Sequence, residues 1–161
     1  MKMNMINLRF PKKLSIGAAC IGEFLNDADN LEVQRIFILS IPEIQPVLSP
    51  FLKELEKRNY RFFIDLSIKN EPTVSDFEKI LILARDFQPD LIVGIGGGSV
   101  LDVAKLVAAQ LDNTQSLSEI SGINLLASRN TLLACMPTTS GTGSEVSPNA
   151  SLLDEKDNMK K

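Results

Sequence analysis

The chain has 161 residues, of which 44% are hydrophobic and 23% are charged, a composition typical of a globular protein with a buried core. Its formal net charge of −3 argues against binding to nucleic acid or to an anionic membrane surface. The first ten residues carry charge without a sustained apolar run, and no stretch is apolar enough for a membrane span. We therefore expect a protein without a secretory signal or membrane segment.

The sequence contains no histidine. Histidine is both the commonest metal ligand and the commonest general acid or base, so any step that needs one must use residues outside these 161. The two cysteines, Cys20 and Cys135, lie among small or apolar neighbours, as expected for core thiols in a reducing compartment. These features predict a cytoplasmic protein.

Along the first ninety residues, short apolar runs alternate with segments of helical periodicity. After extended pieces within 8–16, we predict a helix at 18–25, a loop at 26–30, a strand at 35–40, a helix at 47–59, a strand at 60–66 and a helix from Glu71 to Gln88. Such alternation is typical of right-handed βαβ units on a parallel sheet, whose ligands bind beyond the carboxyl ends of the strands. This rule places four segments around one crevice: Ser40, residues 66–71, residues 94–99 and the residues after Met136.

The stretch LIVGIGGGSVLDVAKLV, residues 91–107, carries the strongest local signal. Leu91 to Val93 suits a strand that is buried on both faces. The glycines that follow predict a tight turn with positive φ, open to a ligand; they are Gly94, Gly96, Gly97 and Gly98. Ser99 then begins a helix, with Asp102 at the spacing of a capping box. Because unpaired N–H groups and the positive end of the helix dipole meet at such a turn, we expect it to bind an anion such as a nucleotide pyrophosphate.

The helix after this turn is apolar nearly all round, which predicts that it is buried. Asp102 and Lys105 interrupt it and lie on one face, three residues apart. Buried charges need partners or a function. The two interpretations are an ion pair on the helix surface and contact with a bound cofactor, of which the second is favoured.

The second half of the chain contains another segment with functional side chains. Polar residues 112–130 predict a surface connection with one or two short helices, and Thr131 to Met136 predicts a buried strand. The sequence PTTSGTGSE, residues 137–145, follows that strand with five hydroxyl groups, two glycines, and Thr142 and Glu145 at capping-box spacing. It is either a plain hydroxyl-rich loop or a ligand contact, and its expected position facing the glycine turn favours the contact. We then expect an extended segment at 146–153, a turn at 154–158 and a returning strand.

Taken together, GGGSVLDVAK and PTTSGTGSEVSPNASLLDEKDNMKK resemble the amino-terminal domain of the iron-containing (group III) alcohol dehydrogenase family. FPKKLSIG near the start and EPT before the third helix extend the resemblance from about Phe10 to the end. It implies an α/β fold with a Rossmann-like, doubly wound, mainly parallel sheet and helices on both faces, and one dinucleotide-binding domain over residues 1–161.

The resemblance also implies a set of cofactor contacts. The family's glycine turn holds the pyrophosphate of NAD(P), and its threonine-rich loop and a hairpin lysine lie along the cofactor. The matching residues are Gly97, Gly98 and Ser99, with Asp102 close by, then Thr138, Thr139 and Thr142, and Lys160.

Two positions depart from the family pattern. Ser40 and Ile41 stand where many members have an Asp that binds the adenosine ribose, so both NAD and NADP stay open. Glu71 stands where many members have Asn.

Family members are longer, and their helical second domain, absent here, carries one Asp and several His ligands for iron or zinc. We therefore expect this chain to be the cofactor half, truncated at its carboxyl-terminal end, of an NAD(P)-dependent alcohol dehydrogenase acting on a small alcohol or aldehyde. Its catalytic residues and metal ligands are expected in the missing domain. The alternatives are a stand-alone nucleotide-binding module and a dehydroquinate-synthase-like or polyol dehydrogenase relative. Family members often pair through this domain, so a homodimer is an option.

Overall fold

A computed structural model of the chain describes residues 11–18, 20–122 and 124–160. Its helices are α1 (Cys20–Asn30), α2 (Gln45–Lys57), α3 (Val74–Phe87), α4 (Gly98–Gln110) and α5 (Leu117–Ile120), with a 3₁₀ helix η1 (Pro42–Ile44) before α2. Its strands are β1 (Arg35–Leu39), β2 (Arg61–Asp65), β3 (Leu91–Gly96), β4 (Leu132–Pro137), β5 (Leu153–Asp154) and β6 (Met159–Lys160). None of the described helices is long and apolar enough to cross a bilayer.

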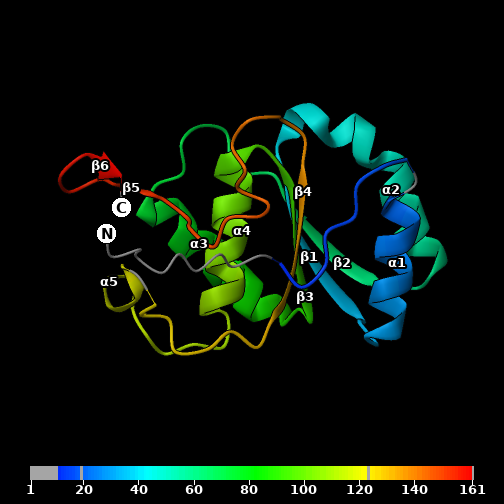
Figure 1. Ribbon diagram of the computed structural model, residues 1–161, viewed down its shortest axis with the longest axis horizontal. Coiled ribbons are helices and arrows are strands. Elements are labelled where there is room, and N and C mark those ends of the chain that lie inside the picture. Colours follow the sequence, from blue (N-terminus) through cyan, green and yellow to red (C-terminus); the bar gives the residue numbers. More distant parts are fainter. Residues whose placement is uncertain (1–10, 19, 123, 161) are drawn as a thin grey trace, which may run out of the picture.

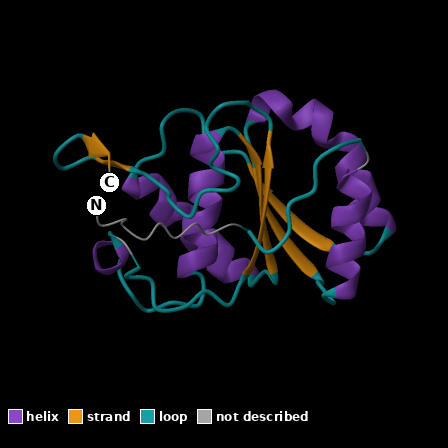
Figure 2. Ribbon diagram, viewed as in Figure 1, coloured by secondary structure: helices purple, strands orange, loops and turns teal. Residues whose placement is uncertain are grey.

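The centre of the molecule is a four-stranded parallel sheet in the order β2-β1-β3-β4. In this register Ile38 of β1 lies opposite Ile64 of β2 and Val93 of β3. Helices α1 and α2 cover one face, and α3 and α4 cover the other (Figure 1). Figure 2 shows the resulting three layers, helix, sheet and helix, with the small β5–β6 hairpin beyond α3. The predicted doubly wound α/β sheet is confirmed.

Two apolar cores hold these layers together, one on each face of the sheet. Ile36 and Ile38 of β1 pack with α1 and α2, whereas Phe37 and Leu39 pack with α3 and α4. All four side chains are completely buried. Alternate residues of one strand thus point into opposite cores, which explains why β1 is an unbroken apolar run.

Several element boundaries differ from the sequence predictions. The loop predicted at 26–30 is wrong: α1 continues to Asn30, because Leu25 and Ala28 keep its helical period and are buried against the sheet. Packing here outweighs the low helix propensity of Asn and Asp. Strand β4 is half-buried, not buried, since it lies at the edge of the sheet. Of the extended segment predicted at 146–153, only Leu153 lies in a strand.

Gly94 and Gly96 serve the packing of α4 on β3, a purpose that was not predicted from the sequence. All four glycines of residues 94–98 have φ outside the positive range, so the prediction of a left-handed turn is wrong. Gly94 and Gly96 lie within β3, directly beneath α4. A Cβ on Gly94 would be 2.8 Å from the Cβ of Ala104, and one on Gly96 would be 2.7 Å from a methyl of Val100. The glycines therefore allow α4 to lie close against β3.

We expect Gly94→Ala to lower the free energy of unfolding by about 1–3 kcal/mol, because the new methyl overlaps Ala104 in a close-packed core. Adding Ala104→Gly should recover part of that loss. Gly22→Ala is the matched control, since Gly22 lies in α1 with nothing within 4 Å of its added Cβ, and it should stabilise the helix by up to about 1 kcal/mol. Urea unfolding of the four chains measures the differences. Equal stability of Gly94→Ala and Gly22→Ala would contradict the close-packing explanation.

Candidate functional site

The order of the strands creates a topological switch point at the carboxyl edge of the sheet. The chain leaves β1 toward β2 through α2, on one face, and leaves β3 toward β4 through α4, on the other. Strands β1 and β3 are neighbours, so the two connections diverge between them. Ligands of open α/β sheets bind at such a switch point. Here it lies between Ser40, after β1, and Gly97, after β3.

Helix α4 begins at this switch point without a side-chain cap. Its N-cap is Gly97, with φ −79° and ψ −177°, and no side chain accepts from its first turn. In contrast, α3 and α5 both begin with complete capping boxes, Thr73 with Asp76 and Ser116 with Glu119. The predicted capping box of Ser99 and Asp102 is wrong, because Ser99 already lies inside the helix. The first N–H groups of α4 therefore remain available to an anion.

The threonine-rich loop lies directly against this helix start. The N–H of Thr138 donates to the carbonyl of Gly96 at 3.0 Å. A Cβ built on Gly97 would be 3.2 Å from Thr139 Oγ1, and one built on Gly98 would be 3.3 Å from a methyl of Thr142. The structure thus brings the glycine turn and the three predicted threonines together, with the threonines exposed. Their contact with a cofactor stays a prediction.

Positive φ occurs in this loop, not in the glycine turn. Gly141 has φ +105° and Gly143 has φ +62°. Thr142, between them, accepts a hydrogen bond from the N–H of Ser144 at 3.3 Å, and no helix follows, so its spacing to Glu145 does not mark a capping box. One carboxylate oxygen of Glu145 is buried without a hydrogen-bond partner.

Asp102 and Lys105 form the ion pair that one of the two sequence interpretations predicted. Their charged atoms are 2.8 Å apart, and the side chains are only 18% and 11% exposed. Both also bind the loop that follows the threonines: Asp102 accepts from the hydroxyl of Ser144, and Lys105 donates to the carbonyl of the same residue. Contact of Asp102 with a cofactor stays a prediction.

Ser40 directly follows β1 at the switch point. Its side chain is completely buried and donates to the carbonyl of Ile95 at 2.9 Å, and its N–H donates to the carbonyl of Asp65 at 3.0 Å. These bonds join the ends of β1, β2 and β3. The hydroxyl of Ser40 is therefore engaged within the protein, and its predicted role in cofactor binding stays a prediction.

Lys160 lies on the β5–β6 hairpin, which packs on the start of α3. Leu153 donates its N–H to the carbonyl of Pro72 at 3.0 Å, and Ser75 donates its N–H to a Glu155 carboxylate oxygen at 3.2 Å. Lys160 forms an ion pair with Glu71, the residue that departs from the family pattern. The two residues are almost ninety positions apart, and no sequence signal links them. Lys160 thus contacts the segment that leads into α3, and its place beside a cofactor stays a prediction.

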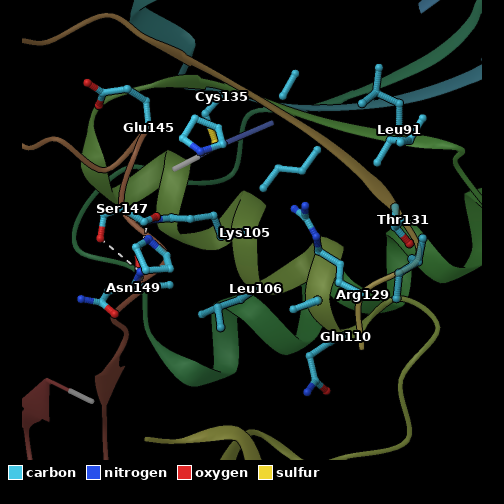
Figure 3. Close-up of a pocket in the computed structure, with 18 of the residues that line it drawn as sticks. Leu91, Lys105, Leu106, Gln110, Arg129, Thr131, Cys135, Glu145, Ser147 and Asn149 are labelled. Carbon is cyan, nitrogen blue, oxygen red and sulfur yellow. Dashed lines mark hydrogen bonds between the residues drawn. The ribbon is translucent and has the colours of Figure 1, made fainter. Parts of the chain in front are cut away.

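A recess, which we call the α4–β4 groove, runs between α4 and the half-buried strand β4 (Figure 3). Lys105, Leu106 and Gln110 line it from α4, and Cys135 lines it from β4. The amide nitrogen of Gln110 is buried without a hydrogen-bond partner. Thr138 lies at the groove, whereas Gly97, Gly98 and Ser99 do not line it. The groove and the helix start are therefore different places on the molecule.

The residues that the structure describes do not fit a divalent metal. Among them, no three His, Cys, Asp or Glu side chains cluster in a way that could hold an ion. The sequence also has no histidine. Metal chemistry is therefore not assigned to these residues.

The similarity of this chain to known proteins identifies its family. The iron-containing alcohol dehydrogenase profile matches residues 11–161. This chain belongs to the iron-containing alcohol dehydrogenase family. The sulfoacetaldehyde reductase of Bilophila wadsworthia is 32% identical over 152 residues, which cover 93% of this chain and 39% of that protein.

Solved structures share the fold of this chain. An alcohol dehydrogenase from Oenococcus oeni aligns with a TM-score of 0.89 at 21% identity, over 97% of this chain and 42% of that one. A sulfoacetaldehyde reductase from Bifidobacterium kashiwanohense in complex with NAD⁺ aligns with a TM-score of 0.79 at 21% identity, over 98% of this chain and 42% of that one. The chain spans about two fifths of the length of these relatives.

We expect the Cys135 thiol to react slowly with iodoacetamide at pH 8. Burial raises the pKa of Cys135 to about 11, so its thiolate, the reactive form, is scarce at that pH. Both cysteines are only partly buried, which corrects the prediction of core thiols. Mass spectrometry of a Cys20→Ser chain isolates the Cys135 reaction, whose rate should rise about tenfold per pH unit from 8 to 10. A rate that levels off below pH 9 would contradict the raised pKa.

Proposed function

We propose that this chain is the cofactor-binding domain of an NAD(P)-dependent, metal-assisted alcohol dehydrogenase that interconverts an alcohol and an aldehyde or ketone by hydride transfer. The observation that carries the proposal is the uncapped start of α4 at the topological switch point, with the threonine-rich loop against it. Family membership and the NAD⁺ complex of the Bifidobacterium kashiwanohense reductase support it.

The pyrophosphate is the part of the cofactor that suits the start of α4. The N–H groups of Gly97, Gly98 and Ser99 belong to the first turn, where no side chain competes for them. Hydrogen bonds to a charged group contribute about 1.5–3 kcal/mol each, and the helix dipole adds about 0.3–1 kcal/mol. A dinucleotide with two phosphates is therefore a better match than a neutral ligand.

The threonine hydroxyls supply the polar groups that a dinucleotide needs beside its phosphates. Thr138, Thr139 and Thr142 are exposed at the helix start, and each hydroxyl can donate and accept a hydrogen bond. Lys160 would approach the cofactor from the hairpin, if it left its ion pair with Glu71. When bound, the nicotinamide accepts or supplies the hydride, and this chain's residues bind and orient it.

Ser40 and Ile41 are compatible with both NAD(H) and NADP(H). Neither residue has a carboxylate to repel a 2′-phosphate. The nearby residue Asp65 is 7% exposed, and its Oδ1 accepts from the N–H and the hydroxyl of Ser67 at 2.9 and 2.6 Å. This carboxylate oxygen is therefore engaged within its own turn.

A stand-alone nucleotide-binding module is the second candidate. The lack of a metal-holding group among the described residues fits both candidates, because the first expects its metal ligands outside these residues. Both candidates predict nucleotide binding, and only the first predicts turnover when the remaining length found in relatives is present.

Isothermal titration calorimetry with NAD(H) and NADP(H) tests the proposal. We expect Gly98→Asp to weaken binding at least tenfold, because its carboxylate would occupy the anion site and repel the pyrophosphate; tenfold corresponds to about 1.4 kcal/mol. Gly22→Asp is the matched control, since it adds the same charge on α1, where no heavy atom lies within 4 Å of a Cβ added at this position. Its affinity for the nucleotides should equal that of the unsubstituted chain.

Equal affinity of the unsubstituted chain and a folded Gly98→Asp chain would contradict the placement of the phosphates at α4. No binding of any of the four nucleotides by a folded chain would contradict the proposed function of these residues.

A further inference from the structure

We infer that Asp102 and Lys105 are positioning residues, which hold the threonine-rich loop in place against the glycine turn without themselves touching the cofactor. The effect on nucleotide affinity rests on the proposed function. The holding of the loop does not, because it follows from contacts within the chain.

The ammonium group of Lys105 donates its hydrogen bonds to the backbone of the loop. It donates to the carbonyls of Ser144 at 3.1 Å, of Ser147 at 3.4 Å and of Asn149, and it pairs with Asp102 at 2.8 Å. Figure 3 shows the side chain extending from α4 toward Ser147 and Asn149. An ammonium has three N–H groups, so these acceptors use all of them. No donor is left for a ligand.

Asp102 binds both ends of the same segment. Its Oδ1 accepts from the hydroxyl of Ser144 at 2.6 Å, and its Oδ2 accepts from the N–H and the hydroxyl of Ser151 at 3.2 and 3.4 Å. Ser144 is 7% exposed, so its hydroxyl depends on this carboxylate for a partner. We call residues 144–151, held by Asp102 and Lys105, the clasped segment.

The clasped segment continues directly from the threonines. Ser144 donates its N–H to Thr142 Oγ1 at 3.3 Å, and Thr142 lies against Gly98. Residues 138–151 belong to no strand or helix, and two positive-φ glycines lie within them. Such a segment is held by few backbone bonds, which makes its side-chain contacts decisive for its order. Helix α4 carries the glycine turn at its start and the ion pair one turn later, so it fixes both sides of the site.

An ordinary ion pair at the same spacing serves as the comparison. Lys79 and Asp76 of α3 are also three residues apart, with their charges 3.6 Å apart and their side chains 75% and 50% exposed. Exposed pairs of this kind contribute little to stability. The Asp102–Lys105 pair differs because it is mostly buried and contacts residues about forty positions away in the chain.

Hydrogen–deuterium exchange of Lys105→Met tests the holding of the loop without any nucleotide. We expect amide exchange across residues 138–151 to rise about tenfold or more, since charge-assisted bonds to the loop are lost, while exchange in β1 and β3 stays unchanged. Lys79→Met is the matched control and should leave the loop as it is. If Lys105→Met folds poorly, the double variant Asp102→Asn/Lys105→Met replaces it, because it leaves no unpaired buried charge. The double variant should show the same rise in loop exchange.

Calorimetry with the nucleotide that the unsubstituted chain binds then tests the positioning. Lys105→Met should bind it about 10- to 100-fold more weakly while the chain stays folded. Restoring the ammonium should restore the affinity. Lys105→Cys is introduced into a Cys20→Ser chain and alkylated with 2-bromoethylamine, which gives a side chain that ends in an amine and is nearly as long as lysine. Cys135→Ser in the same background leaves the introduced cysteine as the sole thiol of the chain.

Unchanged loop exchange in Lys105→Met would overturn the proposal, whether or not the chain binds nucleotide. Raised loop exchange with unchanged affinity would overturn the positioning part, as would a weakened affinity that alkylation fails to restore. If the unsubstituted chain binds no nucleotide, the proposed function fails and the positioning role falls with it. The exchange result still decides whether the pair holds the loop.

Discussion

The close contact between β3 and α4 is the constraint on which the rest of the structure depends. It exists because Gly94 and Gly96 remove the side chains that would otherwise separate the strand from Ala104 and Val100. The same helix is buried along most of its length and joins β3 to β4, so it cannot shift without disturbing the sheet. Its uncapped start is thereby fixed at the switch point of the topology, where a backbone anion site is most useful.

The threonine-rich loop has the opposite character, since it lacks regular structure and gains its order from α4. Two charged residues of the helix supply that order, and their burial makes the arrangement costly unless every group is paired. The contacts to Ser144, Ser147, Asn149 and Ser151 meet this requirement. A single helix thus organises both halves of the candidate site: its backbone forms one half, and its side chains hold the other.

Much of the fold could be predicted from the sequence, because apolar runs and helical periods reflect burial that is decided locally. The strand–helix alternation lies in this class. The extent of α1 could not be predicted, since burial of Ala28 against the sheet decides it. The glycine conformations were predicted wrongly because glycine permits both positive φ and close packing, and only the position of α4 separates the two. The bonds of Lys105, like those of Ser40, join residues far apart in the chain, for which no short motif exists.

The measurement that tests the account most directly is a nuclear magnetic resonance titration of the chain with NADH and NADPH, following the backbone amides. The account predicts that amides of Gly97, Gly98 and Ser99 shift together with those of residues 138–142, along one binding curve. That result would place a single ligand between the helix start and the loop. Saturable shifts confined to other parts of the protein, with both of these segments unchanged, would contradict the claim that α4 and the threonine-rich loop form the cofactor site.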